Sequence, residues 1–344
     1  MIRFNNDYNH GAHPAILEML GQINDKSYGG YGKDEWCEKA AQEIKKYMDC
    51  PEADIHFLVG GTQANYVVIA SALRPYQGVI CAESGHIHVH ETGAVENCGH
   101  KVLALPHKDG KITAQQIRTE AELYKTSGVQ EHIVEPKMVY LSYPTEYGTI
   151  YSKAELVAIH EVCQEYGMYL FVDGARLGYG LAAGSADLTL ADLAKYTDVF
   201  YCGGTKCGFL FGEAVVITNP ELQPFFRSYM KQNGALLAKG WLLGVQFYTM
   251  FEQGLYFQIT KQAVEQAMRI KVAFSEQGIP SLIESDTNQQ FVILENSQME
   301  KLAENYIFEF EKKIDDAHTA VRFCTSWSTT EAEVDALVED IKKL

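Results

Sequence analysis

The sequence predicts an α/β fold, with a mostly parallel central sheet flanked by helices, followed by a smaller C-terminal α+β domain. The first two-thirds of the chain alternates between short segments rich in β-branched residues and longer segments with apolar residues at helical spacing. This alternation implies right-handed βαβ units, whose strands run parallel. Near residue 220 the pattern changes to long helical segments and then strands. We expect residues 1–250 to form the large domain with an N-terminal arm and residues 251–344 the small one.

The first 33 residues are polar and rich in glycine and tyrosine, apart from a short helix expected near residue 14. They could form a lid, a subunit contact or an ordered surface arm. A helix is expected over 34–48, where apolar residues recur every four positions. The strands expected after it cover 55–59, 79–82, 102–105, 138–142, 169–173 and 199–202. The helices expected between them cover 62–73, 114–124, a segment beginning at the capping box Ser152-x-x-Glu155, and 188–195.

The last third of the chain is expected to be largely helical over 220–278. Its apolar segment 241–251 fits either a core helix or an oligomer contact. Strands are expected at 281–294 and 320–324, and a final helix opens near Thr330.

Composition limits the classes of function. Apolar residues make up 47% and charged residues 22% of the 344 residues, as in globular proteins. A net charge of −16 argues against a nucleic-acid or anionic-membrane partner, because both need a basic face. The eight cysteines show no CxxC pairing, the N-terminus has no apolar signal core, and no segment is long enough to span a bilayer. These features predict a cytoplasmic enzyme with reduced thiols.

Lys206 lies in the segment 201–208, just after an expected buried strand and before a second apolar segment, 209–217. A lysine among small residues between two buried strands is costly unless the protein uses it. Burial also lowers the pKa of an amine, which makes it a nucleophile that can form a Schiff base with an aldehyde. The alternative is a flexible surface turn with the charge in water.

Two further segments follow strands at the edge where parallel sheets bind ligands. Gly60-Gly61-Thr62-Gln63 begins a helix, and its exposed N–H groups suit a phosphate; the alternative is a glycine turn with Thr62 as N-cap. Asp173 ends a strand next to small residues, so its carboxylate needs a cation or donors.

Arginines provide candidate sites for a substrate carboxylate. Arg176, three residues after Asp173, can bind a carboxylate through two parallel hydrogen bonds, unless the two form a structural ion pair. Arg322 lies in an otherwise apolar strand and is a second candidate, although a surface arginine with an apolar stem has the same pattern.

His86, His88 and His90 allow two interpretations. On a strand the three imidazoles would share a face and could bind a transition metal. On a helix His86 and His90 would lie together. We favour one imidazole stacking on an aromatic cofactor.

Taken together, in their order and spacing, these motifs resemble the threonine aldolase/β-eliminating lyase family, which belongs to the aspartate-aminotransferase-like (fold type I) enzymes dependent on pyridoxal 5′-phosphate (PLP). The resemblance covers nearly the whole chain. It implies that Lys206 bonds to the cofactor as a Schiff base, that Asp173 pairs with the pyridine nitrogen, and that His86 stacks on the ring.

The resemblance also implies further site residues. Those holding the phosphate would be Gly61, Thr62 and Gln63. Arg176, which also borders the cofactor, and Arg322 match the arginines that bind the substrate carboxylate. Asn6 falls where the family usually has a serine near that carboxylate. Lys239 lies where the family brings basic residues across a subunit interface toward the phosphate, so a homodimer or homotetramer is implied.

The implied reaction is retro-aldol cleavage of a β-hydroxy amino acid to glycine and an aldehyde, as in low-specificity L-threonine/L-allo-threonine aldolases. One segment departs from the family pattern: Glu146 occupies the place of a histidine that handles the β-hydroxyl group. Glu146 could act as a base, or it could indicate another substrate side chain or bond. The alternatives are another PLP-dependent β-eliminating lyase or aminotransferase, and, outside this class, a metal-dependent hydrolase using His86, His88 and His90. A binding module that only keeps the fold is disfavoured by the intact Lys206 and Asp173.

Overall fold

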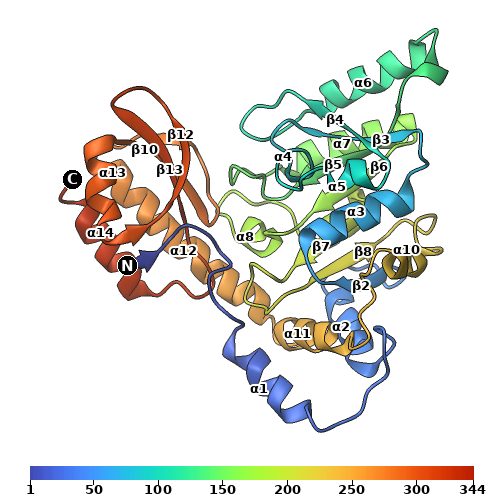
Figure 1. Cartoon of the computed structure of the whole chain (residues 1–344), viewed down its shortest axis with the longest axis horizontal. Helices are drawn as coiled ribbons and strands as arrows, with labels where there is room; N and C mark the ends of the chain where they lie inside the picture. Colours follow the sequence, from blue (N-terminus) through green and yellow to red (C-terminus); the bar gives the residue numbers. More distant parts are fainter.

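The structure is a computed structural model that describes residues 1–344, and its main feature is a seven-stranded sheet (Figure 1). The strands lie in the order β2-β8-β7-β6-β5-β3-β4. Their bounds are β2 Asp54–Leu58, β3 Gln77–Ala82, β4 Lys101–Leu105, β5 Glu135–Ser142, β6 Tyr169–Asp173, β7 Val199–Gly203 and β8 Glu213–Ile217. β8 is antiparallel to both β2 and β7, and the other pairs are parallel. Six strands therefore run in one direction, which confirms the predicted fold class.

Helices cover both faces of this sheet, because its strands are apolar on both sides. Along β7, Phe200 and Cys202 belong to a cluster of 45 buried residues, whereas Val199 and Tyr201 belong to a cluster of 22 on the opposite face. The helices packed on the 45-residue cluster are α1 Pro14–Ile23, α2 Glu35–Lys45, α6 Ala114–Thr126, α7 Lys153–Tyr166, α8 Leu177–Leu181, α9 Leu190–Tyr196, α11 Trp241–Phe251 and the first part of α12 Leu255–Glu276. Those on the other cluster are α3 Gly61–Ala72, α4 His86–Val89, α5 Ala94–Asn97 and α10 Phe226–Gln232.

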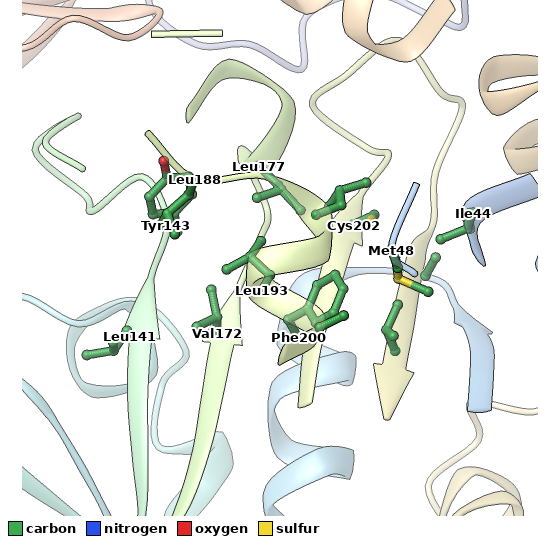
Figure 2. Close-up of a cluster of buried hydrophobic side chains, with 14 of the residues drawn as sticks. Ile44, Met48, Leu141, Tyr143, Val172, Leu177, Leu188, Leu193, Phe200 and Cys202 are labelled. Carbon is green, nitrogen blue, oxygen red and sulfur yellow. The ribbon is translucent and has the colours of Figure 1, made fainter. Parts of the chain in front are cut away.

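The larger cluster shows how the alternation along the strands builds the core. In Figure 2, Leu141, Val172 and Phe200 come from three adjacent strands and point to the same side of the sheet, where Leu193 of α9 meets them. The capping box expected at Ser152 is present at the start of α7.

The C-terminal part forms a second, four-stranded antiparallel sheet in the order β12-β13-β10-β9. Its strands are β9 Ser281–Ile283, β10 Gln289–Glu295, β12 Glu309–Lys313 and β13 His318–Cys324. The helices of this part are α12 Leu255–Glu276, α13 Asn296–Ala303 and α14 Glu331–Ile341. A separate cluster of 14 buried residues fills it, and both chain termini lie beside it (Figure 1).

Two predictions for this part were wrong in detail. The single strand expected over 281–294 is broken, because Ser285 and Thr287 lie in a buried loop and donate hydrogen bonds to the Gly148 carbonyl in the large sheet's part of the chain. β12 was missed because it is a charged edge strand, Glu-Phe-Glu-Lys-Lys, without an apolar face.

The N-terminal arm begins in the small part. Strand β1 (Ile2–Arg3) pairs with β11 (Tyr306–Ile307), and Phe4 is fully buried in the 14-residue cluster. The expected domain boundary at residue 250 falls in the last turn of α11 and stays a prediction. None of the helices combines the length and the hydropathy needed to cross a bilayer.

Candidate active site

A cavity of about 890 Å³ opens at the edge of the main sheet where the parallel strands end. Residues from the turns after β2, β3, β5, β6 and β7 line it, together with residues of β12 and β13. The first residue of β8 also lines it, because that strand runs in the opposite direction and begins at this edge. Only seven of the 27 lining residues are hydrophobic, so the cavity suits a polar, charged ligand.

Lys206 lies in the loop between β7 and β8, with its side chain in this cavity. A network of backbone hydrogen bonds fixes the loop, including one from the Gly204 N–H to the Gly212 carbonyl at 2.9 Å. The Tyr179 hydroxyl donates to the Lys206 carbonyl at 2.6 Å. Burial and the charge of Arg176 lower the pKa of the lysine amine. The amine makes no hydrogen bond or close ion pair within the chain. Because the loop is fixed and burial lowers the pKa of the amine, the interpretation of this segment as a flexible surface turn was wrong.

Asp173 ends β6 and is only 4% exposed. Its Oδ2 accepts hydrogen bonds from the Tyr140 hydroxyl at 2.5 Å and the Asn65 amide at 2.9 Å. Its Oδ1 accepts one from the Ala175 N–H at 2.9 Å. Burial alone would raise the pKa of Asp173, but the His86 imidazole and the hydrogen bond from Tyr140 outweigh burial and lower it. The carboxylate is therefore ionised where it faces the cavity.

Arg176 does not pair with Asp173. Its Nε and Nη2 donate to the two carboxylate oxygens of Asp7, at 2.7 and 3.0 Å. Asp7 is 1% exposed and also accepts from the Asn288 amide at 2.9 Å. Burial would raise the pKa of Asp7, but the charges of Arg176 and Lys206 lower it to about 2.

Asn6, expected near the substrate carboxylate, is not among the residues that line the cavity. Its side-chain oxygen accepts from the Tyr8 N–H at 3.0 Å instead. Tyr8 is the arm residue that lines the cavity, and Asp7 next to it holds the cavity residue Arg176; sequence reasoning missed this role of Asp7. The signal was available, since Asp7 belongs to the same polar segment.

The segment expected to hold a phosphate forms the first turn of α3, where Gly60 is the N-cap and Gly61 and Thr62 line the cavity. No hydrogen bond within the chain uses the N–H groups of Gly61, Thr62 or Gln63. These groups and the positive end of the helix dipole favour an anion. The Gln63 side chain turns away, accepting from the Val59 N–H and donating to the Asn233 carbonyl, so only its main chain is available.

The histidine segment is helical, which decides between its two interpretations. His86 and His90 lie on one side of α4 with ring centroids 5.5 Å apart, whereas His88 is exposed and outside the cavity. Nowhere do three or more His, Cys, Asp or Glu side chains gather as a metal-binding group. The strand arrangement on which the metal-dependent hydrolase depended was therefore wrong.

Glu91 orients His86 and is a second site residue that sequence reasoning missed. Its buried Oε1 lies 2.8 Å from His86 Nδ1, which places a proton on that nitrogen, and it accepts from the Asn65 amide at 2.7 Å. Because Asn65 also donates to Asp173, one amide joins the carboxylate behind the histidine to the carboxylate at the end of β6.

The Glu146 carboxyl is bound to the main chain of His86 in the wall of the cavity. Its Oε1 accepts from the Ser142 hydroxyl at 2.6 Å and from the main-chain N–H of His86 at 2.9 Å. Burial raises the pKa of Glu146, and the hydrogen bond from Ser142 opposes this only in part. The carboxyl is therefore fixed against the first residue of α4, and burial favours its protonated form.

Arg322, on β13, reaches the cavity from the small part of the molecule. Its Nη1 donates to the Gln289 side chain at 3.3 Å and its Nη2 to the Asn5 carbonyl at 3.1 Å. Its Nε is buried without a hydrogen bond, 3.7 Å from Glu311 Oε1. Lys239 is exposed and does not line the cavity of its own chain.

Unpaired polar atoms gather in this cavity. Those that are buried without a partner and line it are Asn65 Oδ1, Ser84 Oγ, Tyr201 Oη and Arg322 Nε. Buried polar groups normally have hydrogen-bond partners, so these atoms and the unpaired amine of Lys206 indicate a bound polar ligand.

Comparisons with known proteins agree with this geometry. The family model for β-eliminating lyases matches residues 14–297. The low specificity L-threonine aldolase of a Pseudomonas species (strain NCIMB 10558) is 30% identical, over 99% of this chain and 97% of that protein. The solved threonine aldolase of Leishmania major is 43% identical with a TM-score of 0.97, covering 100% of this chain and 99% of that one. The aspartate aminotransferase of Thermus thermophilus, 14% identical with a TM-score of 0.70, shares the fold. The chain therefore belongs to the threonine aldolase/β-eliminating lyase family of enzymes.

Proposed function

We propose that this enzyme is a PLP-dependent carbon–carbon lyase that cleaves β-hydroxy amino acids, L-threonine and L-allo-threonine among them, to glycine and an aldehyde. One observation carries the proposal. The unpaired Lys206 amine shares a cavity with the ionised Asp173, the His86 ring and the free N–H groups of α3. The names of the relatives in Pseudomonas and Leishmania major support the substrate.

The residues present fit PLP, which combines an aldehyde, a basic ring nitrogen and a phosphate. Lys206 provides the amine for the aldehyde, Asp173 the carboxylate for the ring nitrogen, and the first turn of α3 the donors for the phosphate. His86, oriented by Glu91, provides a flat group for the ring. When bound, PLP supplies an electron sink for the electron pair left when a bond to the substrate Cα breaks.

The chain's own groups would supply the remaining chemistry. Retro-aldol cleavage requires a base that accepts the proton of the substrate β-hydroxyl group as the Cα–Cβ bond breaks. Glu146 suits this role, because burial raises its pKa toward the working pH and Ser142 and the His86 N–H fix its orientation. The proton moves from the hydroxyl oxygen to the Glu146 carboxylate and the aldehyde leaves. Glu146 then returns this proton to Cα, which gives glycine and restores the carboxylate.

Arg322 is the main anchor that we propose for the substrate carboxylate. Its Nε has no hydrogen bond, whereas Asp7 already occupies two donors of Arg176. Arg176 would then act mainly as a fixed positive charge beside Lys206 and the cofactor. Anchoring the carboxylate decides which bond at Cα stands perpendicular to the cofactor ring and breaks.

We also propose a homodimer or homotetramer, in which the exposed Lys239 of one protomer reaches toward the phosphate in another. Lys239 does not line the cavity of its own chain, which agrees with a role at the cavity of a neighbouring protomer. A cytoplasmic location is proposed from the eight cysteines, all of them free thiols.

A spectroscopic titration tests the proposal. The protein loaded with PLP should be yellow, and its visible band should shift on adding glycine and then L-threonine. Lys206→Ala should lose the band of the covalently bound cofactor but keep its fold.

Product analysis then identifies which bond of the substrate breaks. Glycine with acetaldehyde supports the proposal. A keto acid with ammonia would indicate β-elimination, which the departure at Glu146 makes the second candidate, and amino-group transfer to an added keto acid would indicate an aminotransferase.

A further inference from the structure

A second buried carboxyl group, Glu213, lies beside Lys206 and has no role in the chemistry above. It is the first residue of β8, is 2% exposed, and lines the same cavity. It stands opposite Gly203, the last residue of β7, because β8 alone runs antiparallel in the main sheet. The strand reversal therefore brings an acidic side chain to the loop that carries Lys206.

The Glu213 carboxyl is fixed against the two residues that precede Lys206. Its Oε2 accepts from the Gly204 N–H at 3.2 Å, and its Oε1 accepts from the Thr205 hydroxyl at 2.8 Å. Thr205 in turn accepts from the Gly212 N–H at 3.1 Å, which closes the loop. Lys206 is the cationic side chain whose charge lowers the pKa of Glu213.

Four charged groups act on Lys206: Arg176, Asp7, Asp173 and Glu213. Asp7 has a pKa of about 2 in its pair with Arg176, and the pKa of Asp173 is lowered as well, so both carboxylates stay ionised near neutral pH. Burial raises the pKa of Glu213 to about 8, against the opposing effects of the Thr205 hydrogen bond and the Lys206 charge. Glu213 is thus the carboxyl among the three that changes charge in the range where an enzyme works.

We propose that Glu213 is the charge partner of Lys206 and sets the pH at which the lysine loses the proton that it must lose before its amine can react. While Glu213 is ionised, its carboxylate favours the ammonium form of Lys206. When Glu213 is protonated, this effect is absent and the amine releases its proton to solvent more readily. Since Lys206 does not touch Glu213 directly, Glu213 is a positioning residue that acts through the charge of the pair. The inference rests on the proposed function only in that Lys206 is the reactive amine.

The test measures the protonation of Lys206 directly, in the full-length protein without PLP. Brief reductive methylation with formaldehyde and cyanoborohydride across pH 6–11, followed by peptide mass spectrometry, gives the pH midpoint of Lys206. Glu213→Gln keeps a hydrogen-bond acceptor and removes the charge, so the midpoint should fall by about one pH unit. Glu213→Asp should restore much of the difference. The exposed Lys239 in the same digest is the internal control and should not change.

Two results would overturn the inference, one for the variant and one for the native protein. A folded Glu213→Gln protein with an unchanged or raised Lys206 midpoint would overturn the inference and leave Glu213 as a structural brace of the loop. If Glu213→Gln does not fold, the native protein tests the inference. The pH dependence of Lys206 labelling should then show two ionisations, one for each group of the pair. A curve with a single ionisation would refute the pairing. Labelling of Lys206 does not depend on which substrate the enzyme cleaves. Product analysis can therefore refute the aldolase proposal while the labelling experiment still supports the role of Glu213, and the reverse.

Discussion

Replacing Asp7 with asparagine should destabilise the enzyme strongly and in a pH-dependent way. The carboxylate is 1% exposed and forms a two-point ion pair with Arg176. Its pKa falls from 3.8 to about 2 on folding. A difference of nearly two pKa units corresponds to about 2.5 kcal/mol of folding free energy at pH 7. Asp7→Asn also leaves the Arg176 charge buried without its partner, and breaking such pairs costs about 3–5 kcal/mol.

The sign of the pH dependence follows from the direction of this shift. Because the folded pKa of Asp7 is lower than the unfolded one, the ionised carboxylate stabilises the fold at every pH above about 4. This contribution is lost as the pH falls through the folded value. Relative to the native protein, the cost of Asp7→Asn should therefore fall by about 1 kcal/mol between pH 7 and pH 3, because the contribution of the ionised carboxylate drops to roughly half.

Urea unfolding followed by far-UV circular dichroism, at one protein concentration, measures this cost. A matched control is Asp316→Asn, which removes the same charge from an exposed pair with Lys313 and should leave the unfolding midpoint unchanged. An Asp7→Asn protein as stable as the native one would refute the reasoning. So would a cost that is the same at pH 7 and pH 3, since the carboxylate would then not be the source of the stability.

Three further predictions concern other parts of the site and its support. Gly174→Ala should lower stability by more than about 3 kcal/mol and reduce expression, because a Cβ there would lie 1.8 Å from the Tyr201 carbonyl oxygen. Glu91→Gln should cost about 1–3 kcal/mol in unfolding experiments and weaken PLP binding in a fluorescence titration, since His86 loses the group that orients it. Ser152→Ala should cost about 1 kcal/mol in the same unfolding assay without changing kcat or KM, because it removes only the capping box of α7.

Matched controls separate these effects from general damage. Gly11→Ala, where a Cβ would meet nothing within 4 Å, should be close to neutral, and an equal loss at Gly11 and Gly174 would contradict the steric argument. Glu91→Gln should leave the pH midpoint of Lys206 near its native value, unlike Glu213→Gln. Unchanged PLP affinity in Glu91→Gln would show that the orientation of His86 does not matter for binding.

The main sheet could be predicted well from the sequence, because its strands are buried on both faces and read as continuous apolar segments. The strand expected over 169–173 is β6 at the same bounds, and the helix expected over 62–73 differs from α3 by one residue at each end. Asp173 and Lys206 were found because each follows such a strand, which fixes its place at the carboxyl edge. The direction of β8 was not predictable from periodicity, since a buried strand has the same pattern in either orientation.

The residues that sequence reasoning missed depend on contacts far apart in the chain. Asp7 is recognisable only once Arg176 and Asn288 lie beside it, at separations of 169 and 281 residues. Glu91 was adjacent to the histidine segment, but its role requires the helical turn that brings it back to His86. Glu213 lies in the expected apolar segment 209–217. Its place beside the Lys206 loop follows only from the antiparallel direction of β8. The local sequence pattern therefore locates the ends of the strands. The residues that hydrogen-bond or pair with the groups at those ends can be identified only from the tertiary structure.

The course of the N-terminal arm has a practical consequence for anyone handling this enzyme. The Phe4 carbonyl accepts from the Cys324 N–H at 2.7 Å in the small sheet, and nine residues later the His13 N–H donates to the Gly208 carbonyl at 2.8 Å, beside Lys206. Between them Asp7 lies against Arg176, so this short N-terminal segment, the strap, ties the two parts of the molecule together (Figure 1). Trimming this strap, or attaching an affinity tag to it, would alter the site itself, so purification handles and immobilisation supports belong at the C-terminus.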